Sequence, residues 1–552
     1  MPVPSSIASL SATAGSNYPL GSESPSTADD YFRAHASFIA QLRAVVGGAT
    51  NPDIPSAAAD LALNLLDAAD PAKGAGMVGW KRSTLAKQIA TAGDFLNLQP
   101  FSLWEFADQI TDKPDPGDFT TWDWAPAVYA AIQAPAVAGH AILVHEGCQI
   151  KTTVTVDKSV RFMGSPFKYG RGSFFNLTDT TLVMFRIRAH YVVFDGIVIE
   201  GPGKAGTSVA IEVGDGAVNY DKFMFTGDSF VFKWNTGIEL KTQNWTVSNG
   251  AAASTCAIGF RASGLPTTND RRNGYFINAN CHSCDTGIFF PNQFQVVGIV
   301  GCDFNTCVNG VSGKLLRSVI GSNNFFNCSG YEINITDCLS NTISGNMITG
   351  DTTVANTGTG ISASGTSSAI TGNTVTNKGG HGINAALSAS SITGNICTDN
   401  NFFDAATYDG IVISGNSNSV TGNVSRTTTG GASKQRYGIH ILSGTGNVVE
   451  GNVTSGNKTA QIIPGTGNIV RNNSGYVTEN RGTASITTAA TSVTVTHGLS
   501  FTPTAANISI ILTNSTNAAK WWITNITATT FDIVVNVAPG TGTQFFGWQA
   551  AS

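Results

Sequence analysis

The stretch SSITGNICTDN (390–400) contains a Thr-Gly-Asn sequence that the chain uses repeatedly. Aligned on a hydrophobic residue, any residue, glycine and asparagine, six units follow one another: ISGN (343–346), ITGN (370–373), ITGN (392–395), VTGN (420–423), VEGN (449–452) and VRNN (470–473). Their last residues are Asn346, Asn373, Asn395, Asn423, Asn452 and Asn473, spaced 21 to 29 residues apart. A repeat of this length that tolerates insertions is typical of a solenoid, in which each unit stacks on the one before it.

A second short strand pattern recurs between these units: GISA (360–363), GINA (382–385), GIVI (410–413) and GIHI (438–441). Short strands separated by Gly, Asn and Ser turns predict a parallel β-helix, in which each coil adds one strand to each sheet at a spacing of about 4.8 Å. Asparagines at one turn position can stack and hydrogen-bond from coil to coil. The repeat therefore indicates an all-β fold, and it needs no ligand to explain it.

The composition agrees with a β-rich, turn-dense protein, since 12% of residues are charged and 61 are glycine. The net charge of −5 and the scattered Lys and Arg residues disfavour nucleic acid as a partner. No apolar run approaches the ~20 residues that span a bilayer, so we expect no membrane insertion. The first residues, MPVPSSIASLSATAG, lack the features of a signal peptide, which favours synthesis and folding in a cytoplasm.

The nine cysteines are expected to be reduced thiols. Cys284, Cys307 and Cys328 follow the coil spacing, which predicts one stacked internal column. The Cys281-His-Ser-Cys284 motif is the one hint of a metal site, but no second Cys/His pair at finger spacing accompanies it. We therefore predict a thiol stack and no metal.

Pattern changes along the chain predict four regions. Residues 1–100 form a helical region and linker, with an apolar stripe of helical spacing at Tyr31, Phe38, Leu42 and Val45. Residues 101–150 form a cap, and 151–476 form the parallel β-helix. Residues 477–552 alternate differently and predict a separate antiparallel β-sandwich.

In this order the regions resemble a bacteriophage tailspike with a pectate-lyase-like, right-handed, single-stranded parallel β-helix. Residues 123–165 resemble the start of that fold, with a short helix ending in Ala-Ile-Gln and then strand, turn and strand; FADQITDKPDPGD (106–118) departs from the usual start. The C-terminal region resembles tail-protein end domains through His497-Gly498-Leu499 and Thr502-Pro503.

The resemblance implies a homotrimer of the virion tail that is made in the host cytoplasm and acts at the host cell surface. Its N-terminus would attach to a tail or baseplate protein, and the β-helix would bind and usually cleave a bacterial polysaccharide, either capsule or O-antigen. It implies no cofactor. Catalytic carboxylates vary in position in such proteins, so the resemblance places none here.

Following the Gly-Ile strand upstream gives a register for outward side chains, because alternate residues of a strand face opposite sides. The predicted outward column is Glu212, Glu239, Gly259, Phe289, Ser312, Glu332, Ser362, Asn384, Val412 and His440. Glu212 and Glu239 fall on adjacent coils, so their backbones should lie about 4.8 Å apart. We expect one of the two carboxyls to have a raised pKa and to act as a proton donor. A gap of about 5 Å fits a retaining glycosidase, and splayed side chains would fit an inverting one.

Candidate substrate-binding residues surround this pair. Lys241 and Arg261 can hold an anionic sugar, and Glu332 lies within reach of a second subsite. Trp234 and Trp245 are candidate platforms on which sugar rings could stack. The insertion 266–273 adds Asp270, Arg271 and Arg272. Two plainer interpretations remain open. The glutamates can simply pair with Lys241 and Arg261 at the surface, and both tryptophans are more often core or interface residues.

A second candidate groove lies at the lengthened coils 396–410 and 424–438, which emerge at the same turn. They bring together Asp404, Tyr408, Asp409, Lys434, Arg436 and Tyr437. In a trimer these residues could instead fill the subunit interface, and we interpret the nearby His440 as a solvated residue.

The sequence thus favours a tailspike that depolymerises a surface polysaccharide as an endo-acting glycoside hydrolase with a carboxylate pair. The alternatives are a lyase that acts on a uronic acid polymer by β-elimination, with Lys241 and Arg261 in the reaction, or an adhesin that binds the glycan without cleaving it.

Overall fold

The computed structural model describes residues 100–134, 139–164, 173–264, 272–350, 352, 358–403, 407–428, 435–514 and 520–552. For Arg272 it describes the backbone and not the side chain. The predicted helical N-terminal region therefore lies, up to residue 99, outside the described residues. In the described part no helix is long and apolar enough to cross a bilayer.

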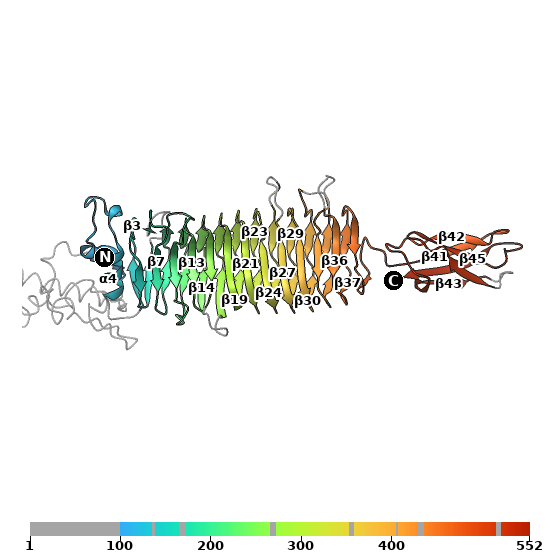
Figure 1. Cartoon of the computed structure of the whole chain (residues 1–552), viewed down its shortest axis with the longest axis horizontal. Coiled ribbons are helices and arrows are strands. Elements are labelled where there is room, and N and C mark those ends of the chain that lie inside the picture. The colour runs from blue at the N-terminus through green and yellow to red at the C-terminus, as the bar shows by residue number, and fades with distance from the viewer. Residues whose placement is uncertain are drawn as a thin grey trace, which may run out of the picture. The chain divides into compact units, whose positions relative to one another are not determined.

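Parallel strands stack coil upon coil and form three faces, as the sequence predicts (Figure 1). Face A consists of β4 (Val154–Val156), β7 (Val183–Ile187), β10 (Val209–Val213), β13 (Thr236–Leu240), β16 (Ile258–Ala262), the first part of β19 (Thr286–Val300), β21 (Asn309–Leu316), β24 (Ile333–Leu339), β27 (Ile361–Thr366), β30 (Ile383–Ser388), β33 (Ile411–Ser414), β36 (Tyr437–Ser443) and β39 (Ala460–Ile463).

Face B follows face A in each coil. It consists of β2 (His140–Leu143), which also pairs with β1 (Phe101–Ser102), and of β5 (Val160–Met163), β8 (Val193–Asp195), β11 (Met224–Thr226), β14 (Trp245–Ser248), β17 (Arg272–Ile277), the second part of β19, β22 (Val319–Gly321), β25 (Thr342–Ser344), β28 (Ala369–Thr371), β31 (Ser391–Thr393), β34 (Ser419–Thr421), β37 (Val448–Glu450) and β40 (Ile469–Arg471).

Face C is a 13-stranded parallel sheet that completes each coil. Its strands are β3 (Cys148–Gln149), β6 (Ser173–Phe175), β9 (Val198–Glu200), β12 (Phe230–Phe232), β15 (Ala252–Ser254), β18 (Asn280–His282), β20 (Asp303–Asn305), β23 (Asn324–Phe326), β26 (Met347–Thr349), β29 (Thr374–Thr376), β32 (Ile396–Thr398), β35 (Val424–Arg426) and β38 (Val453–Ser455).

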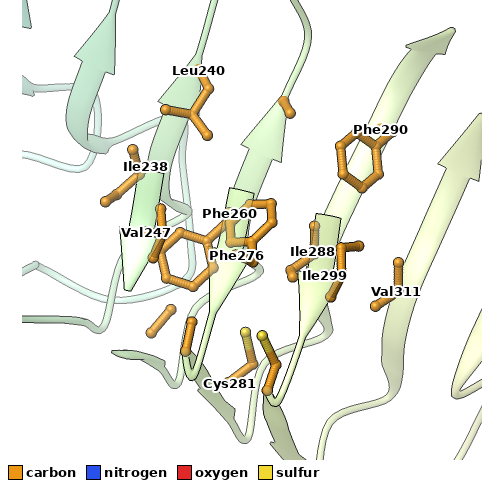
Figure 2. Close-up of a cluster of buried hydrophobic side chains, with 14 of the residues drawn as sticks. Ile238, Leu240, Val247, Phe260, Phe276, Cys281, Ile288, Phe290, Ile299 and Val311 are labelled. Atoms are coloured by element: carbon orange, nitrogen blue, oxygen red, sulfur yellow. The ribbon is translucent and has the colours of Figure 1, made fainter. Parts of the chain in front are cut away.

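The hydrophobic residue after the repeat glycine points into the core, as the sequence predicts. On face A one such column is fully or almost fully buried: Ile211, Ile238, Phe260, Ile288, Val311, Ile333, Ile361, Ile383, Ile411, Ile439 and Ile462. Figure 2 shows Ile238, Phe260 and Ile288 from successive coils beside side chains of the other faces. Burial of this column is what selects the strand register.

The glycine before that residue allows neighbouring coils to approach closely. A Cβ on Gly382 would stand 2.6 Å from the carbonyl oxygen of Gly410, and one on Gly310 would stand 2.5 Å from that of Glu332. A side chain at this position therefore requires the neighbouring coil to shift. On the coil of β24 the position is occupied by Glu332.

The asparagine stack is confirmed. Asn395, for example, donates from Nδ2 to Asn423 Oδ1 at 3.0 Å and to the carbonyl of Ile370 at 2.9 Å. The ladder also begins one coil earlier than predicted, at Asn323. A second polar ladder at the turn between faces A and B was not predicted; it comprises Ser318, Asn341, Ser368, Ser390, Asn418, Asn447 and Asn468.

The predicted thiol column is also present inside the β-helix. Cys284, Cys307 and Cys328 are buried free thiols that interact with one another, and Cys256 extends the column by one coil. All nine cysteines are buried and free. They pack as small hydrophobic residues of the core.

A cap precedes the first coils. It contains the 3-10 helices η4 (Leu103–Gln109) and η5 (Phe119–Thr121) and the helix α4 (Ala125–Gln133), which has a proline in its first turn. Val128, Ala131 and Ile132 of α4 belong to the core of the β-helix, so the helix extends that core at the N-terminal end.

The C-terminal region has two antiparallel three-stranded sheets, in agreement with the predicted sandwich. One contains β41 (Glu479–Ile486), β46 (Gln544–Ala551) and β43 (Ile508–Leu512), and the other contains β42 (Ser492–Thr496), β45 (Thr530–Val535) and β44 (Trp521–Thr524). The short helix η6 (Ala505–Asn507) precedes β43. A separate core forms here around Phe531, Ile533 and Phe546.

Candidate functional site

The outward column of face A differs from the predicted one at two positions. It reads Arg186, Glu212, Glu239, Arg261, Phe289, Ser312, Asn334, Ser362, Asn384, Val412 and His440. Arg261 takes the place predicted for Gly259, and Asn334 takes that predicted for Glu332. The prediction is wrong there because Phe260 and Ile333 are the buried residues, whereas the predicted register points Ile258 and Tyr331 into the core.

Glu212 and Glu239 are register partners on β10 and β13, as predicted. Lys241 Nζ lies 2.7 Å from Glu212 Oε2 and 3.6 Å from Glu239 Oε2, so one ammonium bridges both carboxylates. Arg188 Nη2 donates to Glu212 Oε1 at 2.6 Å, and Ser263 Oγ donates to Glu239 Oε1 at 3.3 Å. The residues are 9% and 8% exposed, so the pair is largely shielded from water.

Glu212 is not the member of the pair with the raised pKa that we expect of a proton donor. Burial by itself would raise its pKa, but hydrogen bonds from Lys241 and Arg188 outweigh burial and hold the pKa of Glu212 below its ordinary value. Glu212 is therefore an anion at neutral pH.

Two further cations flank the pair along the face. Arg186 Nε lies 3.7 Å from Glu212 Oε1, and Arg261 Nη1 lies 3.8 Å from Glu239 Oε1, both beyond hydrogen-bond distance. Four cations thus surround two carboxylates. The glutamates therefore do pair with Lys241 and Arg261, as in the alternative interpretation from the sequence in which these ion pairs are structural.

The two tryptophans are core residues, so the prediction that they form sugar platforms is wrong. Trp234 is fully buried and donates from Nε1 to the carbonyl of Ile199. Trp245 is fully buried against Phe276 and Phe294, with ring centroids 4.7 and 6.0 Å away. Both side chains point inward, so neither offers a ring face to a ligand outside the helix.

Glu332 is not an outward subsite residue either. It is fully buried, and its Oε1 lies 2.5 Å from Nζ of Lys378, which is also fully buried. Lys378 reaches across two coils to this carboxylate and also donates to the carbonyl of Cys328 at 2.9 Å. Burial raises the pKa of Glu332 to about 7, against the lowering effect of Lys378.

The second candidate groove contains a closely connected cluster. Asp409 is fully buried, and Arg436 donates to both of its oxygens at 2.8 Å. His440 Nδ1 lies 2.9 Å from Asp409 Oδ2, and the Tyr437 ring packs edge-on against His440 at 5.0 Å. His440 is therefore not the solvated residue that the sequence favours.

The cluster includes one residue that sequence reasoning missed. His381 Nδ1 accepts the backbone N–H of Asp409 at 2.9 Å, and its ring packs edge-on against Tyr408 at 5.0 Å. Burial lowers the pKa of His381, so it is neutral at pH 7. A signal was present in the sequence, because His381, Asp409 and Tyr437 each stand directly before a repeat Gly-Ile.

Some predicted site residues cannot be placed. Asp404, Lys434, Asp270 and Arg271 lie outside the described residues, as does the side chain of Arg272. Within the described ranges, no group of three or more His, Cys, Asp or Glu residues is arranged to hold a metal ion.

A family model described as periplasmic copper-binding protein (NosD) matches residues 222–407, less than half of the chain. No curated protein matches the chain. Among solved structures, tailspike protein 3 of bacteriophage CBA120 is similar at 16% identity with a TM-score of 0.55, over 85% of this chain and 73% of that chain.

Two other tailspike structures match less closely. That of E. coli bacteriophage HK620, solved in complex with a pentasaccharide, has 12% identity and a TM-score of 0.41, over 89% of this chain and 100% of that chain. The Dettilon tailspike has 14% identity and a TM-score of 0.41, over 84% of this chain and 96% of that chain. At this level of identity, the CBA120 structure establishes a shared parallel β-helix fold.

Proposed function

We propose that this protein is a phage tailspike that binds a bacterial surface polysaccharide, capsule or O-antigen, and cleaves it as an endo-acting glycoside hydrolase. The observation that carries the proposal is the carboxylate pair of Glu212 and Glu239 on the outward column of face A. Retaining glycosidases hold their carboxyl groups about 5–5.5 Å apart, and inverting enzymes about 6.5–9.5 Å. Two carboxylates that share the Lys241 ammonium favour the closer, retaining arrangement.

The contacts of the two glutamates assign them different roles. Glu212 accepts short hydrogen bonds from two cations and stays ionised, which suits a nucleophile. Glu239 has longer contacts to its cations and one hydrogen bond from Ser263, which leaves it the better candidate for the proton donor. Arg186 and Arg261, which are not hydrogen-bonded to the glutamates, would contact sugars on either side of the cleaved bond.

We also propose a homotrimer in the virion tail that is attached through its N-terminal region. Face B supports such an assembly, because Met224, Tyr275 and Val319 are exposed hydrophobic residues of one outward column. Exposed apolar columns of this kind mark association surfaces. Sedimentation of the full chain should give a trimer, and Val319→Glu should shift it toward the monomer; a monomeric wild type would contradict the assembly.

The test of the function is incubation of the full chain with surface polysaccharides from a panel of bacterial strains, followed by size exclusion and a reducing-end assay. We expect shortened chains and new reducing ends for at least one strain. Glu212→Gln and Glu239→Gln should each lower the rate by at least about 100-fold. Glu200→Gln is the matched control, since Glu200 also pairs with a lysine of the next coil, Lys233. Full activity in both site variants would refute the assignment.

The charge ladder itself favours a second candidate, an adhesin that binds the polysaccharide without cleaving it. With Glu212 held as an anion by Arg188 and Lys241, the cluster can act as a rigid binding surface. Binding to a polysaccharide that gains no reducing ends after long incubation would select this function over hydrolysis.

A further inference from the structure

The cluster around Asp409 lies on face A, seven coils away from Glu239. At about 4.8 Å per coil this is roughly 34 Å along the helix, too far for the two groups to act on one bond. The cluster joins three successive coils, since His381 precedes β30, Asp409 precedes β33, and Tyr437 and His440 belong to β36. It therefore needs an explanation of its own.

Asp409 cannot itself be an acid or a nucleophile. It is fully buried, and its oxygens accept from Arg436 Nε and Nη2, from the backbone N–H of Tyr437 and from His440. Although burial would raise the pKa of Asp409, its hydrogen bonds to His440 and Arg436 hold the pKa below the ordinary value. Asp409 is thus excluded as a member of a hydrolytic carboxylate pair.

The hydrogen bonds fix which nitrogen of His440 carries a proton. An ionised Asp409 only accepts hydrogen bonds, so Nδ1 of His440 must be the donor, and Nε2 is the ring nitrogen left to exchange a proton with a ligand. Within the described residues Nε2 has no hydrogen-bond partner, and it is not among the buried atoms that lack one. With 13% of the side chain exposed, Nε2 is the atom of His440 that meets solvent or a ligand.

The charged and titratable groups around His440 come from all three coils. They are Asp409 and Arg436, the phenol of Tyr437 and the neutral His381. The strand on the other side, β39, contributes Ile463 as the register partner of His440. Arg436 uses one edge of its guanidinium on Asp409 and lies 4.6 Å over the Tyr437 ring, so its Nη1 donors remain for an anion.

We propose that this cluster is an acid–base site that cleaves a uronate-containing polysaccharide by β-elimination, with His440 as base, Tyr437 as acid and Arg436 as the partner of the uronate carboxylate. Such a reaction needs a base, an acid and a cation at the carboxylate. These three groups occur together here, and Asp409 serves as a positioning residue for two of them.

The elimination balances without any further reactant. His440 Nε2 takes the proton from carbon 5 of the uronate, and the electron pair of that bond becomes the double bond between carbons 4 and 5. The bond from carbon 4 to its glycosidic oxygen breaks, and the oxygen leaves with the proton of the Tyr437 hydroxyl. Arg436 stabilises the charge that builds on the carboxylate in between. Water then returns the proton from His440 to Tyr437.

The plain alternative is a structural clamp that ties the lengthened turns before β33 and β36 together. A clamp predicts that His440→Gln, Tyr437→Phe and Asp409→Asn change stability alone. The elimination site predicts an unsaturated uronate product, which absorbs in the ultraviolet and forms at a rate that depends on His440 and Tyr437. It does not depend on the Glu212 and Glu239 pair, so the two proposals can fail separately.

The experiment uses the full chain with three probes that cover the common uronates: polygalacturonate, alginate and hyaluronan. We expect ultraviolet-absorbing product from at least one of them. His440→Gln and Tyr437→Phe should each slow its formation by at least about 100-fold, while Glu200→Gln, whose carboxylate pairs with Lys233 on face C, should retain it. Asp409→Asn should lower the rate and also change its pH profile, because the tautomer of His440 is no longer fixed.

Two results would overturn the proposal. One is the absence of unsaturated product from all three polymers with the wild-type chain, which requires no variant to fold. The other is a wild-type rate in His440→Gln, whose circular dichroism and melting temperature serve as the check on folding. Arg436→Lys is the conservative control, since it keeps the charge and loses the bidentate hydrogen bond, and we expect it to retain part of the activity.

Discussion

The repeat in the sequence places Glu212, Glu239 and Glu332 in a single outward column, but the structure does not. Two of them lie on the outer surface of the β-helix and one lies in its interior. Glu212 and Glu239 face outward among four cations, and Glu332 is enclosed in the core with Lys378. The pKa of Glu212 is lowered, whereas that of Glu332 is raised to about 7. Surroundings, rather than residue type, decide in which direction the pKa of a carboxyl group here is shifted.

The largest expected effect comes from breaking the buried pair. Glu332→Leu or Lys378→Met alone should each destabilise the protein by about 3–5 kcal/mol, because a buried ionisable group loses its partner. The double variant should recover most of that loss. Urea unfolding measures all three.

The surface pair Glu450 and Arg471, with N–O distance 3.1 Å, is the matched control. Glu450→Leu and Arg471→Met should cost about 1 kcal/mol or less. If the buried single variants cost no more than these, the contrast between the two sides of the wall is wrong.

The pH dependence of the two sides should have opposite sign. Because the pKa of Glu332 rises on folding from about 4.5 to about 7, its contribution to stability is fully present below pH 4.5 and is lost as the pH rises through 7. Because the pKa of Glu212 falls on folding, its contribution is present above pH 4.5 and is lost as the pH falls below that value.

Unfolding of the wild type, Glu332→Gln and Glu212→Gln from about pH 2 to pH 8 tests these slopes. The wild type should lose stability relative to Glu332→Gln as the pH rises. It should lose stability relative to Glu212→Gln as the pH falls. Slopes of the same sign for both residues would show that the two environments are not distinct.

Replacing a buried polar residue of the asparagine ladder should have a moderate effect on stability, because all the hydrogen bonds of its side chain are lost. Asn395→Ala leaves the amide and carbonyl groups of neighbouring coils without partners, and it should destabilise by about 1–3 kcal/mol. Asn416 is the control, because it is exposed and accepts a single backbone hydrogen bond, from Thr445, and Asn416→Ala should cost about 0.5–1 kcal/mol. Equal effects on chemical denaturation would argue against an internal ladder.

The smallest expected effect on stability is that of Glu212→Gln. Gln keeps a side-chain oxygen that can accept hydrogen bonds from Arg188 and Lys241, and these two cations are 21% and 28% exposed, so water can solvate the charge that loses its partner. We therefore expect a cost of about 0–1 kcal/mol. Its melting temperature should remain within a few degrees of the wild type. A large drop would show that the charge cluster serves mainly to hold the coils together.

The sequence predicts the fold well because the repeat states it many times. Asn346 to Asn473 and the buried isoleucines recur at one register, so local errors average out. Each site residue occurs only once, so no other coil corrects an error in its register. A two-residue error in the register wrongly removes Arg261 from the outward column of face A and wrongly adds Glu332 to it. The alternation of strand residues also ends at the turn before β24, which is why Glu332 points inward.

Other features of the site depend on contacts that no repeat encodes. The bridge from Lys378 to Glu332 spans 46 residues, and the burial of Trp234 and Trp245 depends on which face their strands or turns adjoin. The Asp409 cluster could be predicted from the sequence only in part. The titratable residues before the Gly-Ile units were visible in the sequence, but the partnership of His440 with Asp409 required the coil stacking.

The most direct test of the account compares activity with stability in Glu239→Gln and Glu332→Gln on a polysaccharide that the wild type cleaves. Glu239→Gln should lose at least about 100-fold in reducing-end formation with little change in melting temperature. Glu332→Gln should show an altered melting temperature and, once folded, the wild-type rate. Retained activity in Glu239→Gln, or a loss that merely follows its stability, would contradict the claim that the outward carboxylates of face A do the chemistry.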